Sequence, residues 1–238
     1  QDGEPFPYVL GHWEFFGLDL DITPDVLIPR PETELLVEKA IAWLQTSEKK
    51  TPLMTLGVAD IGTGSGVIAI SIALHVPNVR IVATDISSAA LDVAKRNAKK
   101  FNVQDKIEFI ECDLLPESKF KSNALSSLKG QTSNFRPLTF DLICANLPYI
   151  PSETLQGLPI YGREPTLALD GGKDGLDFYR RLLQLAPAWL APGGMILLEI
   201  EATRGVEAMR LAYDTFSSAT IHLHQDLAGR DRLLEIMP

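Results

Sequence analysis

The amino-acid sequence predicts an α/β fold built on a mostly parallel sheet. Hydrophobic segments of strand length alternate with segments of helical periodicity through most of the 238 residues. A glycine-rich turn joins the first strand of this series to its first helix, and hydrophobic residues make up 45% of the chain. Such alternation is typical of parallel sheets with right-handed crossovers and helices on their faces.

The individual elements follow from local patterns. The early acidic residues after Pro31 favour a helix start, and apolar residues then recur at helical spacing. Helices are expected at residues 32–46, 67–75, 89–101, 176–190 and 206–213. Strands are expected at residues 54–61, 79–84, 107–110, 140–145, 195–200, 219–224 and 232–236.

The two ends of the chain and one internal segment depart from this alternation. The last two strands are too close for a crossover helix, so they should pair as an antiparallel hairpin and complete a seven-stranded sheet. Residues 8–22 are expected to form a short β-hairpin before the sheet. Residues 117–137 are polar and without periodicity, which predicts a surface loop.

Composition narrows the class of protein. The net charge of −9 argues against a protein held mainly by nucleic-acid phosphates. Cys112 and Cys144 lie within or beside apolar runs, which favours buried thiols and a reducing compartment. No apolar run approaches the ~20 residues of a membrane span, and the start has no signal-peptide pattern. We expect a cytoplasmic protein, or an organellar-matrix one if the source is eukaryotic.

The glycine-rich turn predicts a cofactor site. Three glycines alternate after Asp60, so the backbone can turn tightly and a ligand can approach main-chain N–H groups. Val67 stands where a dinucleotide fingerprint needs glycine, and the phosphate-loop lysine is missing. An acidic turn suits a cationic ligand without phosphate, such as S-adenosylmethionine. The expected contacts are Gly62, Thr63, Gly64, Ser65 and Gly66.

Two more acids end strands on the same side. Asp85 ends the second strand of the series, where a carboxylate can accept both ribose hydroxyls. Asp85 could instead cap the next helix, but Ser87 or Ser88 is better placed to be that N-cap. Asp113 ends the third strand and is expected to accept the adenine amine, with Leu114 packing on the ring. A plain turn aspartate remains the alternative for Asp113.

The segment after the fourth strand predicts the reaction site. A polar amide side chain followed by a proline and a flat ring suits a planar, weakly nucleophilic nitrogen, such as that of a carboxamide. Because a carboxamide nitrogen is a poor nucleophile, catalysis must position it and stabilise the transition state. The Asn146 side-chain oxygen and the Leu147 carbonyl can each accept one N–H of such an amide, and Pro148 biases Leu147 towards an extended backbone. The ring of Tyr149 is expected to be exposed and to stack on the amide. Asn146 and Tyr149 are thus the candidate catalytic residues, and Asn146–Tyr149 the substrate site.

These motifs and their flanks resemble the peptide chain release factor glutamine methyltransferases of the HemK/PrmC type. The similarity extends over nearly the whole chain, with the most specific parts at residues 28–34 and 171–176. The matching segments are residues 28–34, 60–66, 146–149, 163–165, 168–176 and 226–232. The resemblance implies a Rossmann-like class I S-adenosylmethionine methyltransferase. It also implies that the Gly62–Gly66 turn, Asp85 and Asn146 bind the cofactor.

The resemblance further implies the substrate, which in this family is the glutamine of the Gly-Gly-Gln loop of class 1 release factors. Two residues depart from the family pattern: Leu147 replaces a usual proline, and Leu114 replaces a frequent aromatic residue. Members also carry a small N-terminal helical domain. Residues 1–30 are therefore expected to be a β-hairpin and linker left from the junction to that missing domain, and residues 31–238 the methyltransferase domain.

Several alternatives stay open at this stage. A ribosomal-protein glutamine methyltransferase, a nucleic-acid base methyltransferase and a non-catalytic cofactor-binding module share parts of the pattern. The four histidines lack metal-ligand spacing, so no metal is expected. The long segment 151–175 suggests a functional lid, in which Arg163 either orders the substrate or forms a structural ion pair. Arg30, Glu32 and Thr33 are expected to border the cofactor mouth.

Overall fold

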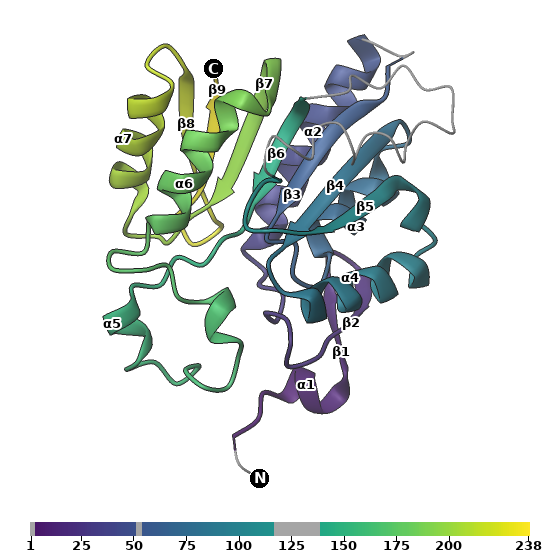
Figure 1. The fold of residues 1–238 in the computed structure, drawn as a ribbon, viewed down its shortest axis with the longest axis vertical. Coiled ribbons are helices and arrows are strands. Elements are labelled where there is room, and N and C mark those ends of the chain that lie inside the picture. Colours follow the sequence, from purple (N-terminus) through teal and green to yellow (C-terminus); the bar gives the residue numbers. More distant parts are fainter. Residues whose placement is uncertain (1–2, 51–53, 117–138) are drawn as a thin grey trace.

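A central seven-stranded sheet organises the molecule (Figure 1). The computed structural model describes residues 3–50, 54–116 and 139–238. The strand order is β5-β4-β3-β6-β7-β9-β8, with β3 to β7 parallel and β9 antiparallel to both neighbours. The strands are β3 (Leu56–Ile61), β4 (Val79–Asp85), β5 (Ile107–Glu111), β6 (Phe140–Ala145), β7 (Leu190–Glu199), β8 (Thr220–Gln225) and β9 (Asp231–Met237). This confirms the predicted mostly parallel sheet and its C-terminal hairpin.

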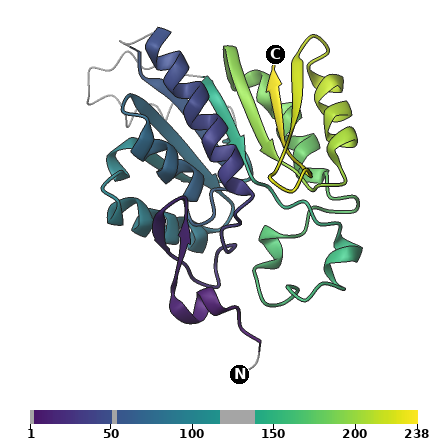
Figure 2. The same ribbon diagram turned by 180° about the vertical axis from the view of Figure 1, so that it is seen from behind.

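Helices cover both faces of the sheet (Figures 1 and 2). Apolar residues of α2, α3 and α4 pack on one face, and those of α6 and α7 pack on the other. These helices are α2 (Thr33–Lys50), α3 (Val67–His75), α4 (Ser88–Lys100), α6 (Asp177–Leu185) and α7 (Gly205–Thr215). Within the part of the chain that the structure describes, no helix is long and apolar enough to cross a bilayer.

The strand order reverses between β3 and β6, which are neighbours in the sheet. From β3 the chain moves outward through β4 to β5, then returns to the other side of β3 with β6 and β7. Ligands of doubly wound sheets bind outside the carboxyl ends of the strands at such a switch point. Ile61 pairs with Ala145 at this edge, so the glycine turn and the Asn146 segment emerge side by side.

The N-terminal segment is partly as predicted. Strands β1 (His12–Phe15) and β2 (Leu18–Asp21) form the expected antiparallel hairpin. Phe16 and Gly17 both have positive φ angles, 52° and 72°, as a two-residue hairpin turn requires. The preceding helix α1 (Phe6–Leu10) was not predicted, because five residues are too few to show a helical period.

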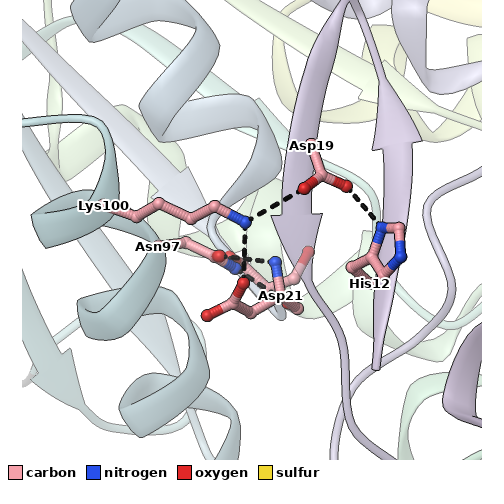
Figure 3. Close-up of polar contacts among 6 residues, drawn as sticks. His12, Asp19, Asp21, Asn97 and Lys100 are labelled. Atoms are coloured by element: carbon pink, nitrogen blue, oxygen red, sulfur yellow. Dashed lines mark hydrogen bonds and ion pairs between the residues drawn. The ribbon is translucent and has the colours of Figure 1, made fainter. Parts of the chain in front are cut away.

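The hairpin is fastened to α4 by polar contacts (Figure 3). Asn97 accepts from the Asp21 N–H at 2.8 Å and donates to the Asp21 carbonyl at 3.0 Å. Lys100 reaches the carboxylates of Asp19 and Asp21. Asn97 also donates to the Ser65 carbonyl at 2.9 Å, so one buried amide ties the hairpin to the glycine turn.

Most other boundaries agree with prediction, and the differences have local causes. The helix predicted at 176–190 ends as an α-helix at Leu185 and continues as the 3-10 turn η4 (Ala186–Ala188), because Pro187 has no N–H to donate. Two short elements, α5 (Ser152–Leu155) and η3 (Thr166–Ala168), break up the long segment 151–175. The loop predicted at 117–137 lies outside the described residues.

Candidate active site

A cavity of about 330 Å³ opens at the carboxyl ends of β3 to β6. Its volume falls within the range of small-molecule sites, and its walls combine apolar side chains with a few polar groups. Ten of the predicted site residues line it: Gly62, Thr63, Gly64, Ser65, Asp85, Asp113, Leu114, Asn146, Leu147 and Pro148. Gly66 and Tyr149 are not among its lining residues.

The glycine turn needs its glycines for different reasons. All three have positive φ angles, between 55° and 85°, where an L side chain is strained. At Gly64 an added Cβ would meet no atom within 4 Å, so this backbone faces open space at the cavity. At Gly66 a Cβ would come within 3.1 Å of both Ile70 and Ala94. Gly66 therefore permits close packing of α3 and α4 rather than lining the cavity.

Asp60 supports the turn from below. Its Oδ2 atom accepts from the Thr63 hydroxyl at 2.6 Å and from the Ala69 N–H at 3.1 Å. Burial raises the pKa of Asp60 to about 6. Its second oxygen is buried without a hydrogen-bond partner among the described residues. Asp60 thus stabilises the turn through hydrogen bonds and keeps one oxygen that could accept another.

Asp85 joins the turn to the next helix. Its carboxylate accepts from the Gly64 N–H and from the Ser87 N–H, both at 2.9 Å. Ser87 caps α4 by accepting from the Ala90 N–H, as expected. Burial raises the pKa of Asp85. Since each carboxylate oxygen can accept more than one hydrogen bond, Asp85 keeps acceptor capacity toward the cavity.

The predicted adenine end contains two residues that the sequence did not single out. The Asp113 carboxylate pairs with the Arg181 guanidinium at 2.5 Å, and Arg181 also lies over the ring of Phe178. Both α6 residues line the cavity. Nothing in the local sequence distinguishes them from other residues of an amphipathic helix. Leu114 has a φ angle of 62°, and its carbonyl accepts from the Thr84 hydroxyl at 2.6 Å.

The segment after β6 lines the cavity and carries two hydrogen-bond acceptors. Asn146 donates through Nδ2 to the Thr33 hydroxyl at 3.0 Å, so its Oδ1 atom is the end left for another partner. No donor from the described residues occupies the Leu147 carbonyl. The Leu147 side chain is buried against Gly62, which fixes the backbone beside the glycine turn.

Tyr149 differs from expectation because its ring is largely covered. Its hydroxyl donates to Glu199 Oε1 at 3.4 Å, and burial raises the Tyr149 pKa far above its ordinary value. Gly171 and Gly175 pack against the Tyr149 backbone so closely that neither could carry a Cβ. The Gly-Gly-Lys-Asp-Gly-Leu segment therefore supports the reaction motif from outside.

The segment 151–175, the predicted lid, is anchored to the loop before α2. Glu164 is buried and accepts from Arg30 at 2.5 Å and from the Ile28 N–H at 3.2 Å. Arg30 and Thr33 line the cavity, whereas Glu32 does not. Arg163, for which either a substrate-ordering role or a structural ion pair was predicted, is exposed and forms no ion pair within the described residues. Its neighbour Glu164 provides the structural ion pair instead.

Comparison with known proteins identifies the family. Residues 39–125 match the family model described as Methyltransferase small domain. A release factor glutamine methyltransferase of Moorella thermoacetica is 43% identical over 97% of this chain and 74% of the relative. That of Geobacter sulfurreducens is 39% identical over 97% of this chain and 72% of the relative. The chain belongs to the release factor glutamine methyltransferase family.

A solved structure agrees with this assignment. The release factor-specific protein-(glutamine-N5) methyltransferase of Alicyclobacillus acidocaldarius is 30% identical, with a TM-score of 0.50, over 91% of this chain and 98% of that chain. The resemblance inferred from sequence motifs is thus confirmed. The fold is that of a class I S-adenosylmethionine methyltransferase, as predicted.

The cavity suits the cofactor of this family. The open space at Gly64 lets a ligand approach the main chain, while Asp85 can accept hydroxyl protons and Leu114 provides an apolar surface. Within the described residues, the lining contains the carboxylates of Asp25, Asp85 and Asp113 against the guanidinium groups of Arg30 and Arg181. Since Arg181 is paired with Asp113, this lining favours a cationic ligand over a pyrophosphate.

Proposed function

We propose that this chain transfers a methyl group from S-adenosylmethionine to the side-chain amide nitrogen of a glutamine in a class 1 peptide chain release factor, most specifically that of its Gly-Gly-Gln loop. One observation carries the proposal most directly. Asn146 and Leu147 both line the cavity, and no donor from the described residues occupies Asn146 Oδ1 or the Leu147 carbonyl. A primary amide has two N–H groups to offer them.

The residues act by positioning the acceptor amide. S-adenosylmethionine supplies an electrophilic methyl group on a sulfonium. Asn146 and Leu147 hold the amide nitrogen in one plane, and the Tyr149 ring limits its movement out of that plane. Because the amide lone pair is delocalised, this fixed geometry matters more than early proton removal. We assign catalytic roles to Asn146 and Tyr149, and substrate binding to Asn146–Tyr149.

The cofactor residues are assigned by the same reasoning. The turn Gly62–Gly66 gives the cofactor access to the main chain, Asp85 receives the ribose hydroxyls, and Asn146 borders both substrates. We assign Asp113 and Leu114 to the adenine end, where Arg181 now holds the Asp113 carboxylate. We further divide the chain into a hairpin and linker at residues 1–30 and a methyltransferase domain at 31–238. Phe15 and Leu20 of the hairpin are buried in the same core as α2.

A labelling experiment with competing substrates tests the proposal. The purified chain is incubated with methyl-labelled S-adenosylmethionine and, separately, with a class 1 release factor, ribosomal proteins and RNA or DNA. Label is expected in the release factor. Label confined to ribosomal protein would favour that alternative glutamine substrate. Methylation of nucleic acid with steeply salt-dependent binding would favour a base methyltransferase.

A further inference from the structure

The turn between β8 and β9 lies at the same edge of the sheet as the reaction motif (Figures 1 and 2). Strand β8 is parallel to β7, because both are antiparallel to β9. The carboxyl end of β8 therefore lies at the edge where β6 and β7 end, and residues 226–230 follow it. The turn belongs to the segment 226–232 that matches the family pattern, but it does not line the cavity.

A network of hydrogen bonds centred on Asp226 fixes the shape of this turn. The Asp226 carboxylate accepts from the Ala228 N–H at 2.9 Å and from the Arg230 N–H at 3.1 Å. The Asp226 N–H donates to the Arg230 carbonyl at 2.8 Å, and the Gly229 N–H donates to the Asp226 carbonyl at 2.9 Å. Arg232 adds an ion pair with Asp226 at 3.3 Å. A preformed loop of this kind loses little conformational entropy when a partner binds.

The base of the turn is joined to the residue that holds Tyr149. Glu199 of β7 pairs with Leu233 of β9, and the Ile200 N–H donates to the Arg232 carbonyl at 2.8 Å. Glu199 in turn accepts from the Tyr149 hydroxyl at 3.4 Å. The turn is two to three strands away from the end of β6 in the sheet. Since neighbouring strands lie about 4.8 Å apart, this separation is roughly 10–15 Å.

Two apolar side chains and one cation are exposed at this edge. Leu227 is fully exposed in the turn, and Val206 is largely exposed at the start of α7. A Cβ at Gly205 would come within 2.6 Å of Asp231, so the start of α7 lies against the base of the turn. Arg230 is exposed and forms no ion pair with any residue that the structure describes. We call Val206, Leu227 and Arg230 the C-terminal edge surface.

We propose that the C-terminal edge surface docks the folded body of the class 1 release factor whose glutamine enters the cavity. This inference deepens the proposed function and rests on it. A standard protein interface covers about 800 Å² on each partner, which is roughly 30 Å across. A folded substrate centred on the reaction motif therefore reaches the turn. A second copy of this chain bound at the same edge would instead obstruct the substrate.

The exposed groups define the chemistry of the partner surface. Leu227 and Val206 suit apolar side chains of the release factor, and Arg230 suits a carboxylate. Arginine is also among the residue types that contribute most to binding at protein interfaces. Because salt screens exposed charge pairs, the contribution of Arg230 should weaken as ionic strength rises. The C-terminal edge surface thus provides affinity for the whole release factor, while the reaction motif orients the amide.

The test compares a whole substrate with a short one. A full-length class 1 release factor presents the glutamine and its folded body, whereas a synthetic peptide of its Gly-Gly-Gln loop presents the glutamine alone. Methyl transfer to each is measured for Leu227→Ala, Arg230→Ala and the double variant. Leu74→Ala is the matched control, because Leu74 is also exposed but lies near the end of α3, at the opposite edge where β4 begins. Circular dichroism checks the fold, and calorimetry checks cofactor affinity.

We expect a loss of affinity for the full-length substrate alone. In the double variant, KM for the release factor should rise about tenfold, with kcat and the cofactor Kd unchanged. Each single variant should show a smaller rise. Transfer to the peptide should match the wild type in every variant, and Leu74→Ala should leave KM for the release factor unchanged. Added salt should raise this KM more steeply in the wild type than in Arg230→Ala.

Several results would overturn the docking role. A double variant with the wild-type KM would show that the surface does not bind the release factor, while the proposed function would stand. Equal losses with peptide and full-length protein would mean that the turn supports the reaction site instead. A wild-type dimer in sedimentation that Leu227→Ala dissociates would assign the surface to a second copy. A wild type that labels no release factor would refute the proposed function and this docking role together.

Discussion

The two sides of the cavity are built in different ways. On the β3–β4 side, main-chain geometry makes the site: three glycines at positive φ shape the turn, and Asp85 binds the Gly64 N–H. On the β6–β7 side, side chains make it: Asn146 is held by Thr33, and Tyr149 by Glu199. The residues that shape the first side lie close together in the sequence. The second joins residues 113 and 50 positions apart.

This difference has a physical consequence. A backbone site tolerates many side chains but not an added Cβ at its glycines, because strain and occupied space act together. A side-chain network tolerates backbone variation but fails when one partner is lost, since a buried polar group is then left unsatisfied. Substitutions on the two sides should therefore damage different steps: cofactor binding on the first, and methyl transfer on the second.

The largest effect is expected at Asn146. Asn146→Ala removes the acceptor that orients the substrate amide, so transfer should fall by about 10²–10³-fold. The Tm should change little, because the Thr33 hydroxyl is left at the cavity and can bind water. The cofactor Kd should rise far less than transfer falls, because Asn146 is only one of several residues assigned to the cofactor. Single-turnover kinetics and calorimetry measure these quantities. Turnover near the wild-type rate would contradict the proposed mechanism.

Tyr149 should affect the release factor more than the cofactor. Tyr149→Ala removes the ring beside the acceptor amide, and kcat/KM for the release factor should fall about 10- to 100-fold. Tyr149→Phe keeps the ring and loses only the 3.4 Å hydrogen bond to Glu199, so kcat/KM should fall less in this variant. Calorimetric titration that shows a larger loss in cofactor affinity than in release factor affinity would argue against this assignment.

The backbone side is tested at Gly64. Gly64→Ala places a Cβ in open space at the cavity and strains a φ angle of 55°. The cofactor Kd should rise about tenfold, with destabilisation of about 1 kcal/mol. Gly229→Ala is the matched control, because Gly229 has a φ angle of 72° and equal free space but lies in the β8–β9 turn. Gly229→Ala should lose stability without losing cofactor affinity. Equal changes of the cofactor Kd in the two variants would contradict a specific role of Gly64 in cofactor binding.

The smallest effect is expected at the lid anchor. Glu164→Gln weakens the contact with Arg30 and should destabilise the protein by about 1–2 kcal/mol, since Arg30 is partly exposed. Proteolytic cleavage within residues 151–175 should become faster. Glu207→Gln, which disrupts an exposed pair with Arg204, should change neither quantity measurably. A lid equally resistant to protease in both variants would show that Glu164 does not anchor it.

The contrast between the two sides also explains what the sequence could predict. Glycine spacing, the strand-end acids and the Asn-Leu-Pro-Tyr segment are local patterns. The sheet could therefore be predicted, and so could the meeting of the glycine turn and the Asn146 segment at one cavity. The roles of Thr33, Glu164 and Glu199 could not be predicted, because each depends on a partner from a distant element. Tyr149 was expected to be exposed, since no local pattern shows that β7 places Glu199 behind it.

The most direct test of the account maps the transferred methyl group on a class 1 release factor. After single turnover with labelled S-adenosylmethionine, fragmentation mass spectrometry should place the label on the side-chain nitrogen of the glutamine in the Gly-Gly-Gln loop, and Asn146→Ala should remove it. Label on any other residue, or undiminished label with Asn146→Ala, would contradict the account.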